Sequence, residues 1–125
     1  MNVRSIGWLG VRTKNAAGMS AFYRNILGLK LLRKDPDGSM IFCTADGTEA
    51  HVYPEGDEFH KFFSSAPVVG FYVDSFSVAW EDLKRAGVRF IYEVPQHDGK
   101  HAWQHFYAPD GNVYEIIGPD DIGAP

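Results

Sequence analysis

The sequence lacks the features of a disulfide-stabilised or membrane-inserted protein. It contains one cysteine, Cys43, in 125 residues, so no internal disulfide can form. The N-terminal stretch "MNVRSIGWLGVR" has neither the apolar run of a signal peptide nor a segment long enough to span a bilayer. We therefore expect a cytoplasmic protein with no membrane partner. Cys43 lies in the apolar run "MIFCT", which favours a small core residue over a nucleophile.

An excess of basic residues is also missing. The chain has 12 Lys and Arg against 16 Asp and Glu, for a net charge of -4, and the basic residues are scattered along it. This pattern disfavours a nucleic-acid partner. A hydrophobic content of 45% and a charged content of 22% are ordinary for a globular protein. We predict a single domain over residues 1–125.

Two segments have the pattern of amphipathic helices. Residues 16–28, "AAGMSAFYRNILG", and residues 74–87, "DSFSVAWEDLKRAG", carry apolar side chains at helical spacing. Each ends at a glycine, Gly28 or Gly87, which is typical of a helix C-terminus. The second segment also begins with two candidate N-cap residues, Asp74 and Ser75. The two segments are therefore candidates for equivalent helices of a repeat.

Strand-like runs surround both helices in the same order. Each helix follows one run, precedes a second, and is followed by a hairpin pattern with an Asp-Gly turn. The expected runs are 7–13, 29–34 and 40–53 in the first copy and 68–74, 88–94 and 104–117 in the second. The predicted fold is α+β, with two βαβββ modules at about 1–56 and 67–118 and a linker at about 57–66.

Superposing the two Asp-Gly turns places Asp46 on Asp110 and then His51 on Glu115. A polar residue thus recurs at one position of the repeat. Because alternate residues of a strand share a face, His51 lies with Glu49 and Tyr53. Glu115 is the one charged side chain on its strand, and we expect it to point into a cavity and not to solvent.

Strand alternation also separates a core face from a ligand face. The core face, which we expect to lie under the helices, carries Leu9, Val11, Phe42, Val69, Phe71, Val73 and Phe106. The opposite face of the later strand carries His101, Trp103, His105 and Tyr107. That aromatic and polar set suits a ligand cavity better than a dry core.

The phrases "AFYRNILGLKLL", "APVVGFYVDS" and "APDGNVYEIIG" resemble the glyoxalase / bleomycin-resistance / dioxygenase family, the vicinal oxygen chelate superfamily. The resemblance covers nearly the whole chain. It implies that the two modules pair into an open, curved barrel around one cavity, and that the protein is a homodimer. The linker "PEGDEFHKFFSSAP" is too apolar for a free tether, so we expect it to pack, and it is consistent with a dimer interface.

The resemblance also implies four metal-ligand positions, which correspond here to Trp8, His51, Val68 and Glu115. Trp8 and Val68 offer no lone pair, and the two remaining residues are too few for an ordinary site. We therefore expect no resident cofactor, with a divalent metal held by His51 and Glu115 as the alternative. If these two residues face each other, they are a metal site, an acid–base or ligand-binding pair, or a relic that satisfies two polar groups.

The prediction for function is a small-molecule-binding protein with a degenerate metal site and an organic, for example aromatic, ligand. The proposed ligand-binding residues are Trp8, Arg12, Tyr53, Trp103 and His105. Trp8 either stacks on the ligand or fills the space of the lost metal, and Arg12 either clamps an anionic group or is an exposed strand-edge residue. The alternative is a glyoxalase- or dioxygenase-like lyase, isomerase or oxygenase with His51 and Glu115 as catalytic residues, with or without a divalent metal.

Overall fold

The computed structural model describes residues 1–63, 67–108 and 111–123. The chain forms two compact units. Module one is Trp8–Val68, and module two comprises Met1–Gly7 and Val69–Pro125. Both contain helices and antiparallel strand pairs in the order β-α-β-β-β, so the predicted α+β class and the two βαβββ modules are confirmed. Among the described residues, no helix is long and apolar enough to cross a membrane.

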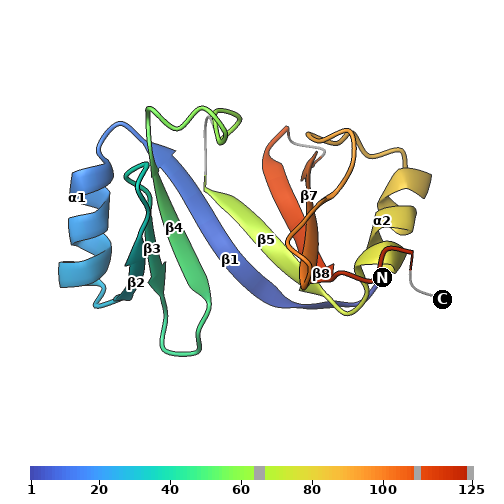
Figure 1. Ribbon diagram of the computed structural model, residues 1–125, viewed down its shortest axis with the longest axis horizontal. Helices are drawn as coiled ribbons and strands as arrows, with labels where there is room; N and C mark the ends of the chain where they lie inside the picture. The colour runs from blue at the N-terminus through green and yellow to red at the C-terminus, as the bar shows by residue number, and fades with distance from the viewer. Residues whose placement is uncertain (64–66, 109–110, 124–125) are drawn as a thin grey trace. The chain divides into compact units, whose positions relative to one another are not determined.

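Module one is a four-stranded sheet with a helical segment on one face (Figure 1). Its strands occur in the order β2-β3-β4-β1, with β4 parallel to β1 and antiparallel to β3. Their bounds are β1 Val3–Thr13, which belongs to module one from Trp8 onward, β2 Lys30–Lys34, β3 Met40–Cys43 and β4 Glu49–Pro54. β1 begins four residues earlier than the predicted run at 7–13.

The predicted helix at 16–28 is present, but it changes type halfway. α1 (Ala16–Ala21) begins at Asn15, whose side-chain oxygen accepts a hydrogen bond from the Gly18 amide at 3.0 Å. It continues as a π-helix, η1 (Phe22–Ile26), and the chain then turns at Gly28, which has a φ of +71°.

The inner face of this segment packs on the core of module one. That core contains Tyr23, Phe42, Ala50 and Val52, with Leu9, Val11, Met19 and Leu31 against it. Burial raises the pKa of Tyr23. Leu9, Val11 and Phe42 therefore lie on the helix-covered face, as the strand alternation predicted.

The turn between β3 and β4 is stabilised by an aspartate. Asp46 Oδ1 accepts hydrogen bonds from the Thr44 hydroxyl at 2.5 Å and the Thr48 amide at 3.0 Å. Gly47, the next residue, has a φ of +88°, which glycine adopts without strain. In module two Gly111 has a similar φ of +86°. Asp110, which the sequence predicts to be the counterpart of Asp46, lies outside the described residues.

These hydrogen bonds predict an unusually acidic carboxyl group at Asp46. The Thr44 hydroxyl and the Thr48 amide favour the charged form and lower the pKa of Asp46 to about 2. Because the pKa is lower in the folded chain, the stabilisation is present above the ordinary value near 4 and is lost as the pH falls toward 2. Thr44→Val should move the Asp46 pKa upward in a carboxyl-carbon NMR titration. An unchanged pKa in that variant would contradict this origin.

Module two contains the second helix and a sheet in the order β5-β8-β7-β6. Its elements are β5 Val68–Val73, α2 Phe76–Arg85, β6 Gln96–His97, β7 His101–Tyr107 and β8 Val113–Pro119. Ser75 is the N-cap of α2 and Gly87 has a φ of +76°, so both predicted ends of this helix are confirmed. The helix buries Phe76 and Ala79 against Val73, Ala102 and Ile116.

The predicted strand at 88–94 is wrong as a continuous strand. Only Phe90 forms a strand-type bridge, to Phe106 on β7. Two residues farther on, the Gln104 side chain accepts from the Tyr92 amide at 3.2 Å and donates to the Tyr92 carbonyl at 2.9 Å. The buried side-chain amide of Gln104 replaces the backbone partner of Tyr92. Backbone pairing with β7 therefore stops here, although the strand-like sequence pattern continues to Val94. The strand after α2 is instead the short β6, which pairs with β7.

Candidate functional site

In module one, strand β4 presents a row of three polar side chains. Glu49, His51 and Tyr53 alternate on one face, while Ala50 and Val52 on the other face are buried in the core. His51 Nε2 lies 2.8 Å from Glu49 Oε1, and His51 Nδ1 lies 2.6 Å from the Tyr53 hydroxyl oxygen. Carboxylate, imidazole and phenol thus form a continuous hydrogen-bonded row.

The charge of Glu49 determines where the protons of His51 lie. An ionised carboxylate only accepts hydrogen bonds, so Nε2 must carry a proton and donate it to Glu49. When the imidazole is neutral, Nδ1 then has the lone pair and accepts from the Tyr53 hydroxyl; when it is protonated, Nδ1 donates instead. In either state, neither nitrogen offers a metal a lone pair without displacing a neighbour.

The indole of Trp8 covers this row. Its ring lies 5.1 Å from that of His51 with an interplanar angle of 27°, and 6.2 Å from that of Phe63 at 25°. Gly10 makes room for it, since a Cβ at this position would lie 2.2 Å from Cζ3 of Trp8. Trp8 is only 9% exposed. This packing favours the space-filling role of Trp8 over a free stacking face.

The linker packs on the same module, as predicted for an aromatic segment. The His60 ring stacks on that of Tyr53 at 3.7 Å, and His60 Nδ1 lies 2.6 Å from Asp57 Oδ2. Phe63 is buried at 3% exposure, whereas Phe59 remains exposed. The last part of the linker, residues 64–66, lies outside the described residues.

Arg12 holds the turn that begins this linker. Its Nε donates to the Asp57 carbonyl at 3.0 Å and its Nη2 to the Glu55 carbonyl at 2.5 Å. Both donors are therefore directed to backbone oxygens of module one. The contacts support a structural role for Arg12 and weaken its prediction as an anion clamp.

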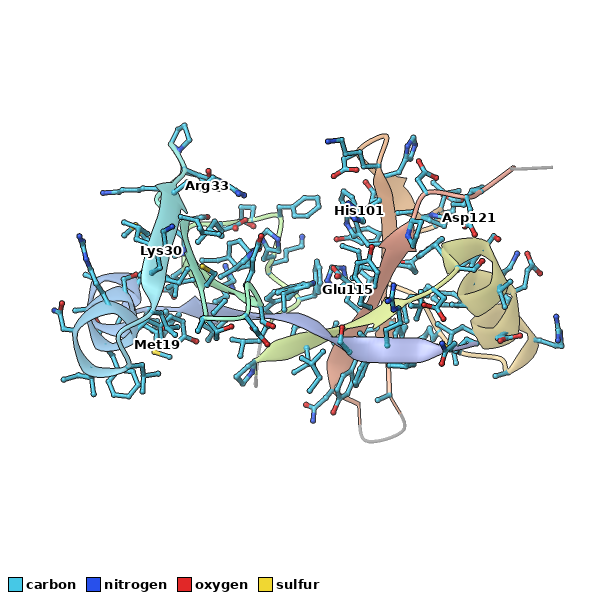
Figure 2. The ribbon with its side chains drawn as sticks, turned by 90° about the horizontal axis from the view of Figure 1, so that it is seen from below. Met19, Lys30, Arg33, His101, Glu115 and Asp121 are labelled. Carbon is cyan, nitrogen blue, oxygen red and sulfur yellow. The ribbon has the colours of Figure 1, made fainter. Side chains whose placement is uncertain are left out.

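In module two, Glu115 lies on β8 (labelled in Figure 2), directly opposite His105 on β7. His105 Nε2 lies 3.1 Å from Glu115 Oε2, and the two residues are 2% and 3% exposed. Burial, together with the negative charge of Glu115, raises the pKa of Tyr92 well above its usual range. Glu115 is thus shielded from solvent beside a histidine of its own module.

The other predicted residue of module two is Trp103. It is half-buried on β7, two residues before His105, opposite Ile117 of β8 and Gln96 of β6. Ala102, on the other face of β7, is buried in the helix-covered core, and Phe106 packs against that core. The core face of β7 is therefore the one that strand alternation predicted, with Trp103 and His105 on the opposite face.

The residues at the four implied ligand positions do not fit a metal ion. Trp8 and Val68 have no side-chain lone pair for a metal, both ring nitrogens of His51 contact Tyr53 and Glu49, and Glu115 Oε2 contacts His105. Among the described residues, no group of three or more His, Cys, Asp or Glu side chains is placed to hold a metal. The structure brings Trp8, His51 and Tyr53 together in module one and His105 and Glu115 together in module two. The facing of His51 and Glu115 stays a prediction.

Five residues that contact the predicted site residues or their neighbours were not themselves predicted as site residues: Glu49, Asp57, His60, Tyr92 and Gln104. Glu49 could have been predicted, because strand alternation places it on the same face as His51 and Tyr53. The other four depend on how non-strand segments fold back on β4 and β7, for which the local sequence has no periodic signal.

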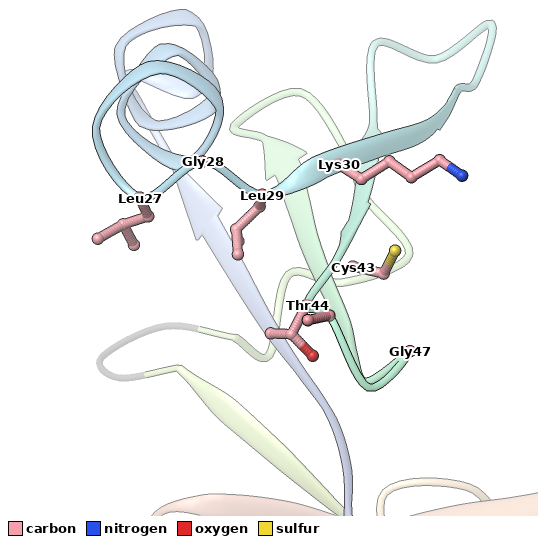
Figure 3. Close-up of a pocket in the computed structure, with 8 residues that line it drawn as sticks. Leu27, Gly28, Leu29, Lys30, Cys43, Thr44 and Gly47 are labelled. Atoms are coloured by element: carbon pink, nitrogen blue, oxygen red, sulfur yellow. The ribbon is translucent and has the colours of Figure 1, made fainter.

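A separate cavity lies in module one, away from the residues predicted to form the site (Figure 3). Its volume is about 460 Å³. It is lined by Leu27, Gly28, Leu29, Lys30, Cys43, Thr44, Ala45 and Gly47. Cys43 is therefore partly accessible and not a fully buried core residue.

Solved structures with a similar fold share little sequence with this chain. Methylmalonyl-CoA epimerase from Mycobacterium tuberculosis has 16% identity and a TM-score of 0.71, over 98% of this chain and 93% of that one. A glyoxalase/bleomycin resistance protein/dioxygenase superfamily member from Vibrio splendidus 12B01 has 11% identity and a TM-score of 0.68, over 94% and 99%. A halotolerant catechol dioxygenase has 22% identity and a TM-score of 0.67, over 94% of this chain and 40% of that one. These likenesses show the fold.

Among curated proteins, none matches the sequence. A family sequence model, in contrast, matches residues 5–116, which include most of both modules and the linker. The chain belongs to the Glyoxalase/Bleomycin resistance protein/Dioxygenase superfamily.

Proposed function

We propose that the protein binds a small organic molecule without the help of a metal ion, and that the row on β4 forms part of the binding site. The observation that carries this proposal is the environment of His51. Its Nε2–H is directed to Glu49 and its Nδ1 to Tyr53, and Trp8 covers its ring. A ligand here meets a hydrogen-bonded protein surface at a position where the family resemblance implies a metal ligand.

The row remains open enough for contact with a ligand. The side chain of Glu49 is 41% exposed and that of His51 is 17% exposed. The accessible part of the row is thus the Glu49 carboxylate and part of the His51 ring, which match an organic ligand with polar groups, while Trp8 and Tyr53, at 9% and 8% exposure, support them from behind. A methylmalonyl-CoA epimerase of the same fold from Streptomyces coelicolor has been solved with 2-nitronate-propionyl-CoA bound, which supports small-molecule binding on this scaffold.

The proposal predicts binding that survives removal of metal. Protein purified without chelator should contain only substoichiometric metal, and aromatic fragments detected by ¹⁹F NMR should bind equally before and after EDTA treatment. His51→Gln should weaken their binding, because the row loses its central hydrogen bonds. His97→Gln is the matched control, since its side chain is 64% exposed. Stoichiometric metal that is lost in both His51→Ala and Glu115→Ala would overturn the proposal.

A second candidate is a metal-free isomerase or lyase. It is favoured by the carboxylate–imidazole–phenol row, in which Glu49 orients His51 and His51 can exchange a proton through Tyr53. The same NMR titrations distinguish the two functions. A binder leaves the bound compound unchanged, whereas an enzyme converts it at a rate that falls in His51→Gln.

A further inference from the structure

After β4 the chain turns and packs back on the end of that strand (Figure 1). Arg12 on β1 is the backbone partner of Tyr53 on β4, and its guanidinium donates to the carbonyls of Glu55 and Asp57. The Asp57 amide donates in turn to the carbonyl of Pro54, the last residue of β4, at 3.0 Å. These contacts fix the backbone of Asp57 at the end of the strand.

The carboxylate of Asp57 holds an imidazole. Its Oδ2 lies 2.6 Å from His60 Nδ1, and its Oδ1 accepts from the His60 amide at 3.2 Å. Asp57 is only 9% exposed. An ionised carboxylate only accepts hydrogen bonds, so Nδ1 carries a proton and donates it. Because one carboxylate binds both the amide and the ring of His60, the orientation of this ring is fixed relative to the linker backbone.

The imidazole of His60 lies against the phenol of Tyr53. The two ring centroids are 3.7 Å apart with an interplanar angle of 14°. Phe63, also from the linker, meets the same phenol edge-on at 5.8 Å and 73°. The hydroxyl lies on the ring axis, so its position follows the first side-chain torsion, and a ring stacked on one face blocks rotation toward that face. The linker therefore confines the phenol whose hydroxyl lies 2.6 Å from His51 Nδ1.

We propose that the Asp57–His60 pair is a positioning element of the row on β4, which keeps the Tyr53 hydroxyl on Nδ1 of His51. The pair acts through Tyr53, since the hydrogen bond itself joins only Tyr53 and His51. The orientation in which His51 meets a ligand then depends on the linker. The inference rests on the proposed function in one respect, namely that the row contacts the ligand.

The first test examines the row without a ligand. In protein labelled with ¹⁵N-histidine, at an alkaline pH where the imidazole is neutral, the Nδ1 signal of His51 reports whether this nitrogen accepts a hydrogen bond. His51→Gln assigns the signal, and Tyr53→Phe shows the shift that follows the loss of the hydroxyl. His60→Ala should produce most of that shift. His60→Phe, which keeps a ring for stacking, should produce little of it.

Met19→Ala is the control for a general loss of stability, because Met19 packs on the helix-covered face of module one and not on the row. It should lower the unfolding temperature and leave the His51 signal unchanged. His60→Leu, which has bulk but no flat ring, answers the same question if His60→Ala does not fold. An unchanged His51 signal in these His60 variants, or equal shifts in His60→Ala and His60→Phe, would overturn the inference.

The second test measures binding of 4-fluorobenzamide by ¹⁹F NMR. His60→Ala should raise its dissociation constant about threefold to tenfold, the scale of one aromatic contact, and His60→Phe less than about twofold. Equal affinity of the wild type and His60→Ala would also overturn the inference. Absence of fragment binding by the wild type would instead overturn the proposed function, while the His51 signals still decide whether the linker positions Tyr53.

Discussion

Replacing Glu115 by alanine is expected to lower the free energy of unfolding by about 2 kcal/mol, as for other buried polar groups that lose a polar neighbour. His105 lies 3.1 Å from Glu115, and both side chains are almost fully buried. The variant therefore leaves His105 in a buried position without its carboxylate neighbour. Denaturation by urea, followed by circular dichroism, measures the difference. The contribution arises within module two, so it is expected whether or not a ligand is present.

Glu81→Ala is the control for this experiment. Glu81 contacts Lys84 at 2.7 Å on the exposed side of α2, and its loss should change stability by less than about 0.5 kcal/mol. A double variant that also replaces His105 with leucine should cost less than the sum of the two single changes, since it removes both partners. Additive costs in this cycle would show that the pair does not interact.

Gly10→Ala is expected to lower the free energy of unfolding by about 2 kcal/mol, in the range of overpacked cores. The added Cβ would lie 2.2 Å from Cζ3 of Trp8 and 2.9 Å from Cε2 of Phe63. The indole is held against His51 and Phe63, so it cannot move without disturbing the row on β4. Thermal unfolding and the NMR signals of His51 should therefore change together.

Gly56→Ala is the matched glycine control, because a Cβ there meets no atom within 4 Å and should have little effect. Trp8→Phe combined with Gly10→Ala tests the origin of the strain. Phenylalanine lacks the outer ring atoms of the indole that meet the new Cβ. The double variant should be more stable than the sum of the single changes predicts, and simple additivity would contradict the steric explanation.

Much of the fold was predictable because local signals agree with the tertiary contacts. Ser75 and Gly87 mark the ends of α2 in the sequence and in the structure. The alternation of Leu9, Val11 and Phe42 assigned the core face of module one correctly. The failure at residues 88–94 has a specific cause, since the strand pattern there is displaced by the side chain of Gln104, which pairs with Tyr92.

The partners within the site were less predictable, because they depend on strand register. A two-residue turn at Asp110–Gly111 would place Phe106 opposite Glu115. The observed register pairs Tyr107 with Val113 and therefore sets His105 opposite Glu115. A shift of one residue therefore decides whether Glu115 lies opposite the phenyl ring of Phe106 or the imidazole ring of His105. Both registers are compatible with the sequence, and the observed pairing of β7 with β8 selects the second.

The change from α1 to η1 sets the position of Leu27 through the number of residues in one helical turn. In η1 the amide of Leu27 donates to the carbonyl of Phe22, five residues earlier, so this turn contains one residue more than an α-helical turn. Deleting a single residue from Phe22–Ile26 would restore the α-helix and rotate the residues between the deletion and β2 by about 100° around the helix axis. Leu27 would then leave the lining of the cavity. The shape of this part of module one therefore depends on the one extra residue in the turn.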